Sequence, residues 1–228
     1  MFGWNRRRHP DMVAFDAIGT LFPLDPLEPL SAALGLPPGA HHNVYSTAIR
    51  DSIALAAIGE HRPFKAAMAA ALDEVLAHHR LNPSPRARAT VLDGLKLLAA
   101  RPDAAAAFRT LHDAGIAVGV LSNGSLRDTK ALLGRTGLAP LVDLVASAER
   151  PGLSKPRPEV YEHMARQARL RPRRLALVAV HAWDVNGAAA AGLITAYVSA
   201  EQPYSPLMRR PDIEAPTLLD AARALVAL

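Results

Sequence analysis

Short apolar runs of strand length, alternating with stretches of helix length, are the feature of this sequence that most limits its fold. Each run is mainly apolar, which is typical of a strand buried on both faces. The alternation predicts βαβ units and a parallel sheet, because two parallel strands need a crossover of about a dozen residues or more. The expected strands cover residues 12–15, 116–121, 142–146, 175–180 and 194–198, and the expected helices cover residues 104–113, 126–135, 158–170, 187–191 and 218–226.

About a hundred residues separate the first run from the second, far more than one crossover needs. Two Ala-rich amphipathic stretches in this interval, residues 41–58 and 63–79, predict an inserted helical cap. A pair of helices is marginal alone, but laid over the carboxyl ends of the strands it buries its apolar face and closes a cleft. We therefore expect an α/β fold: a Rossmann-like core of residues 12–23 and 100–228, and an all-helical cap of residues 24–99, with joints near 83–85 and 101–103.

The composition excludes several classes of function. The chain has no cysteine, and hence no disulfide scaffold, thiol nucleophile, iron–sulfur cluster or cysteine-based zinc site. Its net charge is +5, but the arginines are scattered beside acidic residues and only 5% of residues are aromatic, so we expect no nucleic-acid partner. No apolar run approaches the roughly 18 residues of a membrane span. Residues 1–11, with Arg6, Arg7 and Arg8, are expected to form a basic tail without a secretory signal, which leaves the cytoplasm as the default location.

Polar residues close the first two apolar runs, where an open parallel sheet binds its ligands. Asp16 ends the first run, and Gly19 and Thr20 follow for a tight turn and a hydrogen bond to the carboxylate. By itself this residue is also compatible with a solvated strand-end aspartate. Ser122 and Asn123 end the second run and predict a receptor for an anion or oxyanion, or equally the N-cap of a helix.

Two later segments carry further chemistry. Lys155, one of few lysines, lies between prolines in Ser-Lys-Pro-Arg-Pro, and Tyr161 follows one turn into the next expected helix. Asp184 follows the fourth run and opens a helix, a position that suits a general base, a metal ligand or a helix cap.

In this order the segments resemble the four motifs of the haloacid dehalogenase superfamily of hydrolases. The resemblance covers residues 12–228 and is carried by Asp16 with Gly19-Thr20, Ser122-Asn123, Lys155-Pro156 and Asp184. Within the superfamily, "DAIGTLF", "LSNGS", "SKPRPEVY" and "HAWDVNGA" are most similar to the L-2-haloacid dehalogenase branch.

The resemblance implies a two-step hydrolysis without a cofactor. Asp16 would displace halide and form an ester, which water would then hydrolyse at the Asp16 carbonyl carbon. Lys155 would keep Asp16 ionised, Ser122 and Asn123 would bind the substrate carboxylate, and Asp184 would help to activate the water. The implied partners are a small anionic substrate and a second copy of the chain in a homodimer.

Ile18 departs from the pattern of the superfamily's phosphatases, which carry a second aspartate there to protonate the leaving group. An isoleucine donates no proton, so ordinary phosphomonoesterase chemistry loses its general acid. A magnesium site would still be compatible with Asp16, the Ile18 carbonyl and Asp184. A Mg²⁺-dependent phosphatase or phosphonatase-like enzyme therefore stays an alternative to the dehalogenase.

Ala179 and His181 depart from the dehalogenase pattern, where Ser and Asn usually precede Ala-Trp-Asp. His181 is compatible with a base for ester hydrolysis or with a structural histidine at the strand end. These changes also motivate a third alternative, a cap-bearing protein that binds a small anion without turnover.

In the cap, the resemblance places Tyr45 and Ser46 where dehalogenases carry an arginine that faces the halide. Arg50, one turn later, and Arg62, between the two cap helices, are the candidates to replace it. The remaining candidate substrate contacts are Phe64 and Trp183 as an apolar wall, together with Tyr161.

Overall fold

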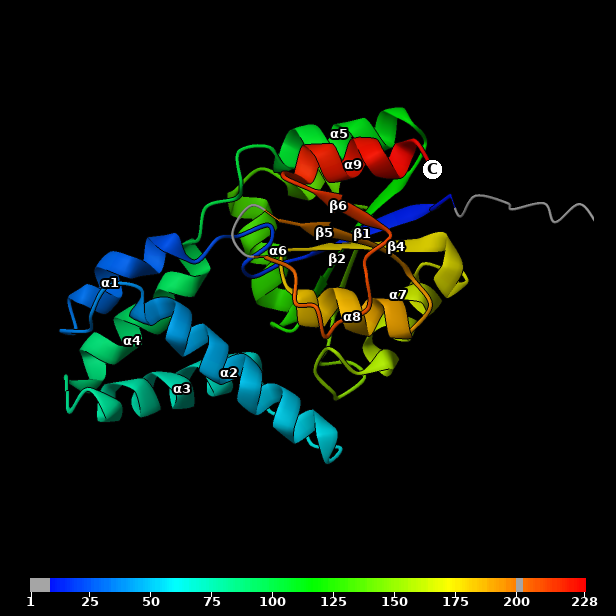
Figure 1. The fold of residues 1–228 in the computed structure, drawn as a ribbon. Helices are drawn as coiled ribbons and strands as arrows, with labels where there is room; N and C mark the ends of the chain where they lie inside the picture. The colour runs from blue at the N-terminus through cyan, green and yellow to red at the C-terminus, as the bar shows by residue number, and fades with distance from the viewer. Residues whose placement is uncertain (1–8, 200–202) are drawn as a thin grey trace, which may run out of the picture.

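The computed structural model describes residues 9–199 and 203–228. Its described residues form one parallel sheet of six strands in the order β3-β2-β1-β4-β5-β6, with helices on both faces (Figure 1). The expected Rossmann-like α/β core is thus confirmed. The strands are β1 (Met12–Asp16), β2 (Ala117–Ser122), β3 (Leu144–Ser147), β4 (Leu175–Ala179), β5 (Ile194–Val198) and β6 (Ile213–Ala215).

Alternation along β1 separates the two faces of the sheet. Val13 and Phe15 belong to the hydrophobic cluster under helices α5, α6 and α9, whereas Met12 and Ala14 belong to the cluster under α7 and α8. Successive side chains of a strand point to opposite faces, and both faces here are covered, so every residue of β1 is buried. The core helices are α5 (Ala104–Asp113), α6 (Leu126–Arg135), α7 (Pro158–Gln167), α8 (Ala182–Ala190) and α9 (Leu218–Val226), with short 3-10 helices at Ala139–Leu141 and Pro172–Arg174.

The register of the central strands brings the polar strand ends to one edge. Asp16 lies opposite Leu121 of β2, and Phe15 lies opposite Val178 of β4. Ser122 and the segment after β4 therefore meet Asp16 at the carboxyl edge of the sheet.

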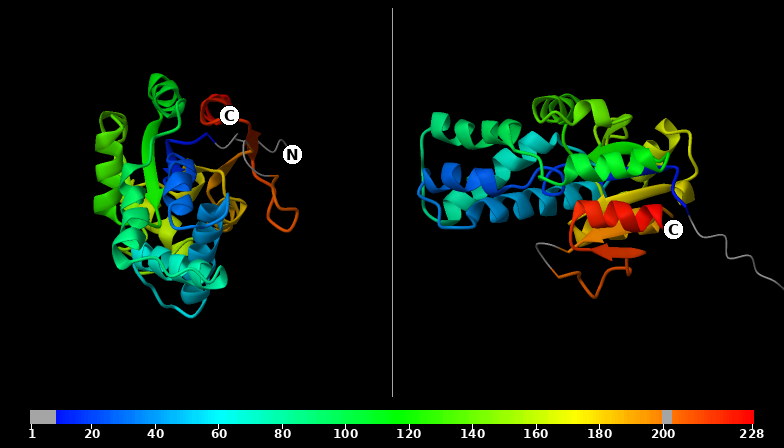
Figure 2. Two further views of the ribbon diagram at one scale, coloured as in Figure 1. Left: turned by 90° about the vertical axis from the view of Figure 1, so that its left-hand side faces the viewer. Right: turned by 90° about the horizontal axis from the view of Figure 1, so that it is seen from above.

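Four helices lie beyond that edge and form the cap (Figures 1 and 2). Helices α2 and α3 pack against each other, and α4 packs against α1 and α3. We propose the division that the sequence suggested, with residues 24–99 as the cap. The cap helices are α1 (Glu28–Ala32), α2 (Ala40–Ala57), α3 (Phe64–His78) and α4 (Pro85–Gly94), with 3-10 helices η1 (Asp25–Leu27) and η2 (Leu95–Leu97).

Three elements differ from the expectation. The predicted joint at 83–85 is wrong, because the Ser84 side chain accepts a hydrogen bond from Ala87 N–H and starts α4 inside the cap. Helix α8 starts at Ala182 rather than at residue 187, which puts Asp184 in its first turn. The short edge strand β6 was not expected.

The N-terminal segment joins the fold earlier than expected. Asp11 pairs with Arg174, and its backbone N–H donates to the Arg174 carbonyl at 2.8 Å. The predicted basic residues Arg6, Arg7 and Arg8 lie outside the described residues. In the part of the chain that the structure describes, no helix combines the length and apolarity that crossing a membrane requires.

Candidate active site

Asp16, Lys155 and Asp184 form a buried cluster of charges at the carboxyl edge of the sheet. Lys155 Nζ donates to Asp16 Oδ1 at 2.8 Å and to Asp184 Oδ2 at 2.6 Å. Lys155 and Asp184 are 0% exposed and Asp16 is 4% exposed. An ammonium so deeply buried is stable only with such partners, so the loss of any one of the three side chains destabilises the other two.

Each member comes from a different element. Asp16 ends β1, Asp184 lies in the first turn of α8, and Lys155 lies in the loop between β3 and α7. The loop is held by Asn123, whose Oδ1 accepts the backbone N–H of Lys155 at 2.8 Å. Gly187 lets α8 approach this loop, because a Cβ there would lie 2.5 Å from Pro156 Cβ.

The environments of the two aspartates push their pKa values in opposite directions. Burial by itself would raise the pKa of Asp16, but the charge of Lys155 and the hydrogen bond to His181 hold that pKa well below its usual range. Burial raises the pKa of Asp184, and the charge of Lys155 only partly offsets this effect. Burial would also lower the pKa of Lys155, but the two carboxylates raise it. Asp16 is therefore the carboxylate that stays ionised, as a nucleophile requires.

Thr20 and His181 contact the other oxygen of Asp16. Thr20 Oγ1 donates to Asp16 Oδ2 at 2.7 Å and accepts the Val180 N–H at 3.1 Å, so it ties the end of β1 to the end of β4. His181 Nδ1 lies 3.2 Å from the same Oδ2. The predicted grouping of Asp16, Thr20, Lys155, His181 and Asp184 is thus found in space.

Tyr45, which the resemblance placed at the position of the dehalogenases' cap arginine, is a site residue to which the sequence analysis gave no role. Its ring stacks on His181 at 5.4 Å, and His181 stacks in turn on Trp183 at 5.3 Å, so the imidazole is held between two aromatic rings. The Tyr45 hydroxyl donates to the Ile18 carbonyl at 3.1 Å. Burial and the charges of the two site aspartates raise the pKa of Tyr45 well above its usual value. Tyr45 is therefore a neutral donor that links the cap to the loop after β1.

Gly19 is required for this approach of the imidazole. Its φ is +89°, and a Cβ there would lie 2.6 Å from His181 Cε1. We expect Gly19→Ala to reduce kcat at least about tenfold, because His181 has to move away from Asp16.

Gly115→Ala is the matched control, since its φ is +74° and a Cβ there would meet nothing within 4 Å. Both variants share the backbone strain, and only Gly19→Ala displaces the histidine. Equal kcat values in the two variants would show that the His181 contact does not matter for turnover.

A small closed pocket faces Asp16. It has a volume of about 10 Å³, about the space of one water molecule. Asn123 Nδ2 is buried there, and among the described residues it has no hydrogen-bond partner. It is therefore a donor available to a ligand, whereas Ser122 Oγ already accepts the Gly124 N–H at 2.9 Å. The lining residues are Asp16, Ile18, Tyr45, Phe64, Ser122, Asn123, Gly124 and Trp183.

The two cap arginines do not reach this pocket. Arg50 is 58% exposed at its side chain and pairs with Glu74 at 2.7 Å and with Asp51 at 2.9 Å. Arg62 is also exposed and pairs with Glu60 at 3.1 Å. The structure therefore does not bring Arg50 to the pocket at Asp16, because Glu74 of α3 pairs with its guanidinium on the surface of the cap.

Tyr161 and Asp184 have other roles than those expected. Tyr161 is fully buried, and its hydroxyl donates to Asp184 Oδ1 at 2.6 Å. It does not line the pocket at Asp16, so the structure does not bring it to the place where a substrate contact was expected. The two oxygens of Asp184 accept from Tyr161 and Lys155, and Asp184 is fully buried and does not line the pocket at Asp16, so it does not meet a water there. Asp184 is a positioning residue for Lys155.

The residues do not fit a magnesium ion held by Asp16 and Asp184. Each oxygen of these carboxylates already accepts from Lys155, Thr20 or Tyr161, and the ammonium of Lys155 lies between the two groups. A divalent cation that bridged both carboxylates would meet the positive charge of this ammonium. In the described residues, no cluster of three or more His, Cys, Asp or Glu could hold a metal ion.

A parallel α/β core with a buried strand-end aspartate, a lysine beside it and a helical cap above it is the arrangement that the sequence motifs predicted. The family model for the haloacid dehalogenase-like hydrolases matches residues 10–192. The chain belongs to this family, as the sequence motifs predicted.

Within this family, the chain is similar to several proteins named (S)-2-haloacid dehalogenases. The chain is 31% identical over 109 residues, 48% of each chain, to (S)-2-haloacid dehalogenase 1 of Pseudomonas sp. strain CBS-3. It is 28% identical over 166 residues to the (S)-2-haloacid dehalogenase of Pseudomonas sp. strain YL, covering 72% of this chain and 70% of that protein. The first of these matches thus spans about half the length of the relative.

A solved structure matches almost the whole chain. It is the L-2-haloacid dehalogenase from Xanthobacter autotrophicus with chloropropionic acid covalently bound, with a TM-score of 0.85 and 23% identity. The match covers 95% of this chain and 98% of that one. This likeness shows the fold.

Proposed function

We propose that the protein is a dehalogenase that hydrolyses a 2-haloalkanoic acid, with Asp16 as the nucleophile. The observation that carries the proposal is the ionised, desolvated Asp16 facing a closed pocket in which, among the described residues, it is the one carboxylate. A halide leaves without a proton, so this reaction needs no general acid. The names of the relatives support the same class of substrate.

In the first step an Asp16 oxygen forms a bond to the second carbon of the acid, and the halide leaves with the electron pair of the carbon–halogen bond. Lys155 keeps Asp16 ionised until it attacks. Asn123 Nδ2 is the donor that we assign to the substrate carboxylate, with Ser122 beside it. Phe64 and Trp183 form the apolar wall.

In the second step water attacks the carbonyl carbon of the Asp16 ester and releases the 2-hydroxy acid. The water has to lose a proton, and His181 is the group beside Asp16 that can accept it. Lys155, close to Asp16 Oδ1, stabilises the negative charge that develops on that oxygen. The enzyme returns to its starting state with one halide and one proton released.

The alternatives of the sequence analysis are less well supported. A phosphatase would need an acid for its leaving group and a metal, but Ile18 is aliphatic and the Lys155 ammonium lies between the two carboxylates. A protein that only binds anions would not need an ionised aspartate beside a buried lysine. We propose that no cofactor is required and that the substrate is a small anion; the homodimer and the cytoplasmic location stay predictions.

The proposal is tested by halide release from each enantiomer of 2-chloropropionate and from chloroacetate, with and without Mg²⁺, and with p-nitrophenyl phosphate as the competing substrate. We expect halide from one enantiomer at the same rate with and without the metal. Phosphate release that a chelator abolishes would contradict the proposal and favour the phosphatase.

His181→Ala is expected to slow ester hydrolysis about a hundredfold or more while halide is still expelled, because a general base contributes about 10²–10⁴-fold. Rapid mixing should then give one equivalent of halide per site, and mass spectrometry should find the acyl group on Asp16. His112→Ala is the control, since this histidine pairs with Asp143 away from the site. A His181→Ala steady-state rate equal to wild type would make this histidine structural.

A further inference from the structure

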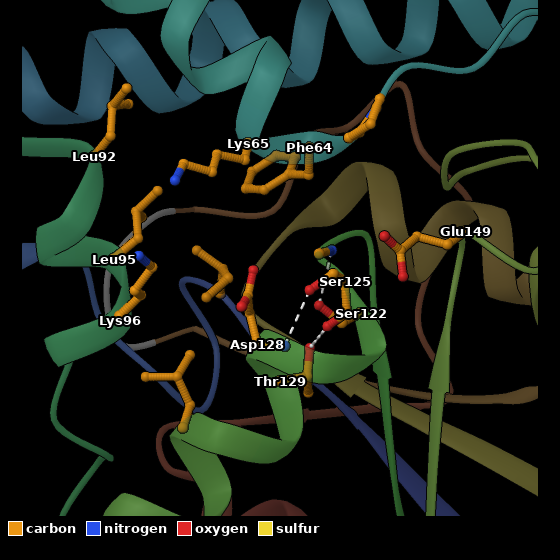
Figure 3. A pocket seen from close by; sticks show the side chains of 14 residues that line it. Phe64, Lys65, Leu92, Leu95, Lys96, Ser122, Ser125, Asp128, Thr129 and Glu149 are labelled. Carbon is orange, nitrogen blue, oxygen red and sulfur yellow. Dashed lines mark hydrogen bonds between the residues drawn. The ribbon is translucent and has the colours of Figure 1, made fainter. Parts of the chain in front are cut away.

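A second cavity adjoins the small pocket at Asp16. Its volume is about 190 Å³, and it shares Ile18, Phe64, Ser122 and Gly124 with the small pocket (Figure 3). The two spaces therefore have a common wall that is made from the loop after β1, the cap and the end of β2. A substrate bound at Asp16 has this cavity as its neighbour.

The walls of the cavity are largely aliphatic and aromatic. The cap contributes Phe64 of α3, Leu92 of α4 and Leu95 of η2, and the core contributes Ile18 and Leu132. Figure 3 shows Phe64, Leu92 and Leu95 on the cap side, with helix α6 opposite. A cavity with such walls favours an apolar ligand, because burial removes its surface from water.

The hydroxyl groups in the cavity are already paired. Ser125 Oγ accepts the Asp128 N–H at 3.0 Å, and Thr129 Oγ1 donates to the Ser125 carbonyl at 2.8 Å.

Lys65, Lys96 and Glu149 also have partners, whereas the carboxylate of Asp128 adds one negative charge to the wall. Lys65 and Lys96 both pair with Asp93, at 3.9 and 2.7 Å. Glu149 accepts the Leu126 N–H at 3.0 Å. The paired groups therefore do not need a charged ligand as a partner.

We propose that this cavity binds the carbon chain of the substrate, from the third carbon onward. The inference rests on the proposed function and names its substrate class: 2-haloalkanoic acids with an unbranched apolar chain, in preference to haloacetates. The cavity measures about 190 Å³, against about 10 Å³ for the pocket at Asp16. It therefore has room for a chain of several carbons beyond the second.

A third cavity, which His181 and Trp183 line, is less suited to such a chain. It is larger, about 430 Å³, and its wall mixes apolar side chains with charged or polar ones such as Arg50, His42 and Ser46. Ile53 of α2 also lines it, and this residue provides a matched control in the same cap.

The test is a series of 2-chloro acids from propanoate to decanoate. We expect kcat/KM to rise about three- to fourfold with each added methylene, as burial of one methylene predicts, and to stop rising once the chain fills the cavity. A series in which kcat/KM is flat or falls from propanoate onward would overturn the inference.

Leu95→Trp and Leu92→Trp fill the cavity from two different elements. Each is expected to lower kcat/KM for 2-chlorooctanoate at least about tenfold and to leave 2-chloropropionate unchanged within about twofold, which also shows that the variant is folded. Ile53→Trp should change neither. If only Ile53→Trp discriminates against the long acid, the chain lies in the other cavity and the inference is wrong.

Binding of unhalogenated acids separates this inference from the proposed function. Calorimetry with propanoate, hexanoate and octanoate needs no turnover, and affinity for the wild-type protein should rise with length and lose that rise in Leu95→Trp. Such binding without halide release from any chloro acid would leave the cavity assignment standing and contradict the dehalogenase. If halide is released but binding and turnover do not depend on chain length, the dehalogenase stands and the cavity assignment is wrong.

Discussion

Replacing Asp16 with asparagine is expected to reduce kcat for halide release by at least about a thousandfold, because the amide is a poor nucleophile at the reacting carbon. The fold should survive, since asparagine has the same shape: its Oδ1 can accept from Lys155, and its amide group can donate to the Thr20 hydroxyl, which can turn to accept. Circular dichroism and thermal unfolding check the fold, and a halide electrode measures the rate.

Asp51→Asn is the control for this substitution, because Asp51 is on the cap surface and pairs with Arg50. It should keep the wild-type rate within about twofold. An Asp16→Asn enzyme that retains more than about a tenth of the wild-type kcat would remove Asp16 from the role of nucleophile.

Lys155→Met is expected to have the second largest effect, on stability as well as on activity. It leaves Asp16 and Asp184 buried without their shared cation, and breaking a buried ion pair in this way costs about 3–5 kcal/mol in the free energy of unfolding. Halide release should fall at least about a hundredfold, because Asp16 is then no longer held in its ionised form. Urea unfolding and the halide assay measure the two effects.

The double variant Lys155→Met with Asp184→Asn separates stability from catalysis. Removing the second charge relieves the repulsion, so we expect part of the unfolding free energy to return while halide release stays low. A double variant that is no more stable than Lys155→Met would argue against a charge cluster as the source of the loss.

The pH dependence of the stability that Lys155 and Asp16 contribute follows from the directions of their pKa shifts. The pKa of Lys155 is raised, so its contribution to stability is full below about 10.4, the value for a free lysine, and is lost as the pH rises through the folded pKa. The pKa of Asp16 is lowered, so its contribution is full above about 3.9 and is lost as the pH falls through the folded pKa. The stability gap between wild type and Lys155→Met should therefore be greatest between about pH 5 and 9.

The parts of the fold and site that depend on short stretches of sequence were predictable. The strand around Phe15 is apolar and ends in Asp16, and Ser122 and Asp184 lie at equivalent points of the later βα units. Because the carboxyl ends of parallel strands meet at one edge, their sequence positions alone were enough to group them. Lys155 was found through its place in the order of motifs.

The parts that depend on packing between distant residues were not predictable. Tyr45 reaches His181 only because α2 lies over the end of β4, and no local pattern in the sequence indicates that contact. Arg50 was expected at the site, but it pairs with Glu74 of α3 instead. That pairing depends on how two cap helices meet and leaves no local pattern in the sequence. Tyr161 was misassigned for a similar reason, since the direction of its side chain depends on how α7 packs against α8.

The central claim, a covalent ester on Asp16, is tested most directly by a single turnover in water enriched in ¹⁸O, with enzyme in excess over substrate. Attack of water on the ester carbonyl puts the ¹⁸O into the Asp16 carboxylate, while the first product takes its new hydroxyl oxygen from unlabelled Asp16. We therefore expect the peptide that contains Asp16 to gain two mass units and the 2-hydroxy acid to gain none. Labelled product together with an unlabelled Asp16 peptide would mean that water displaces the halide directly, and would contradict the account.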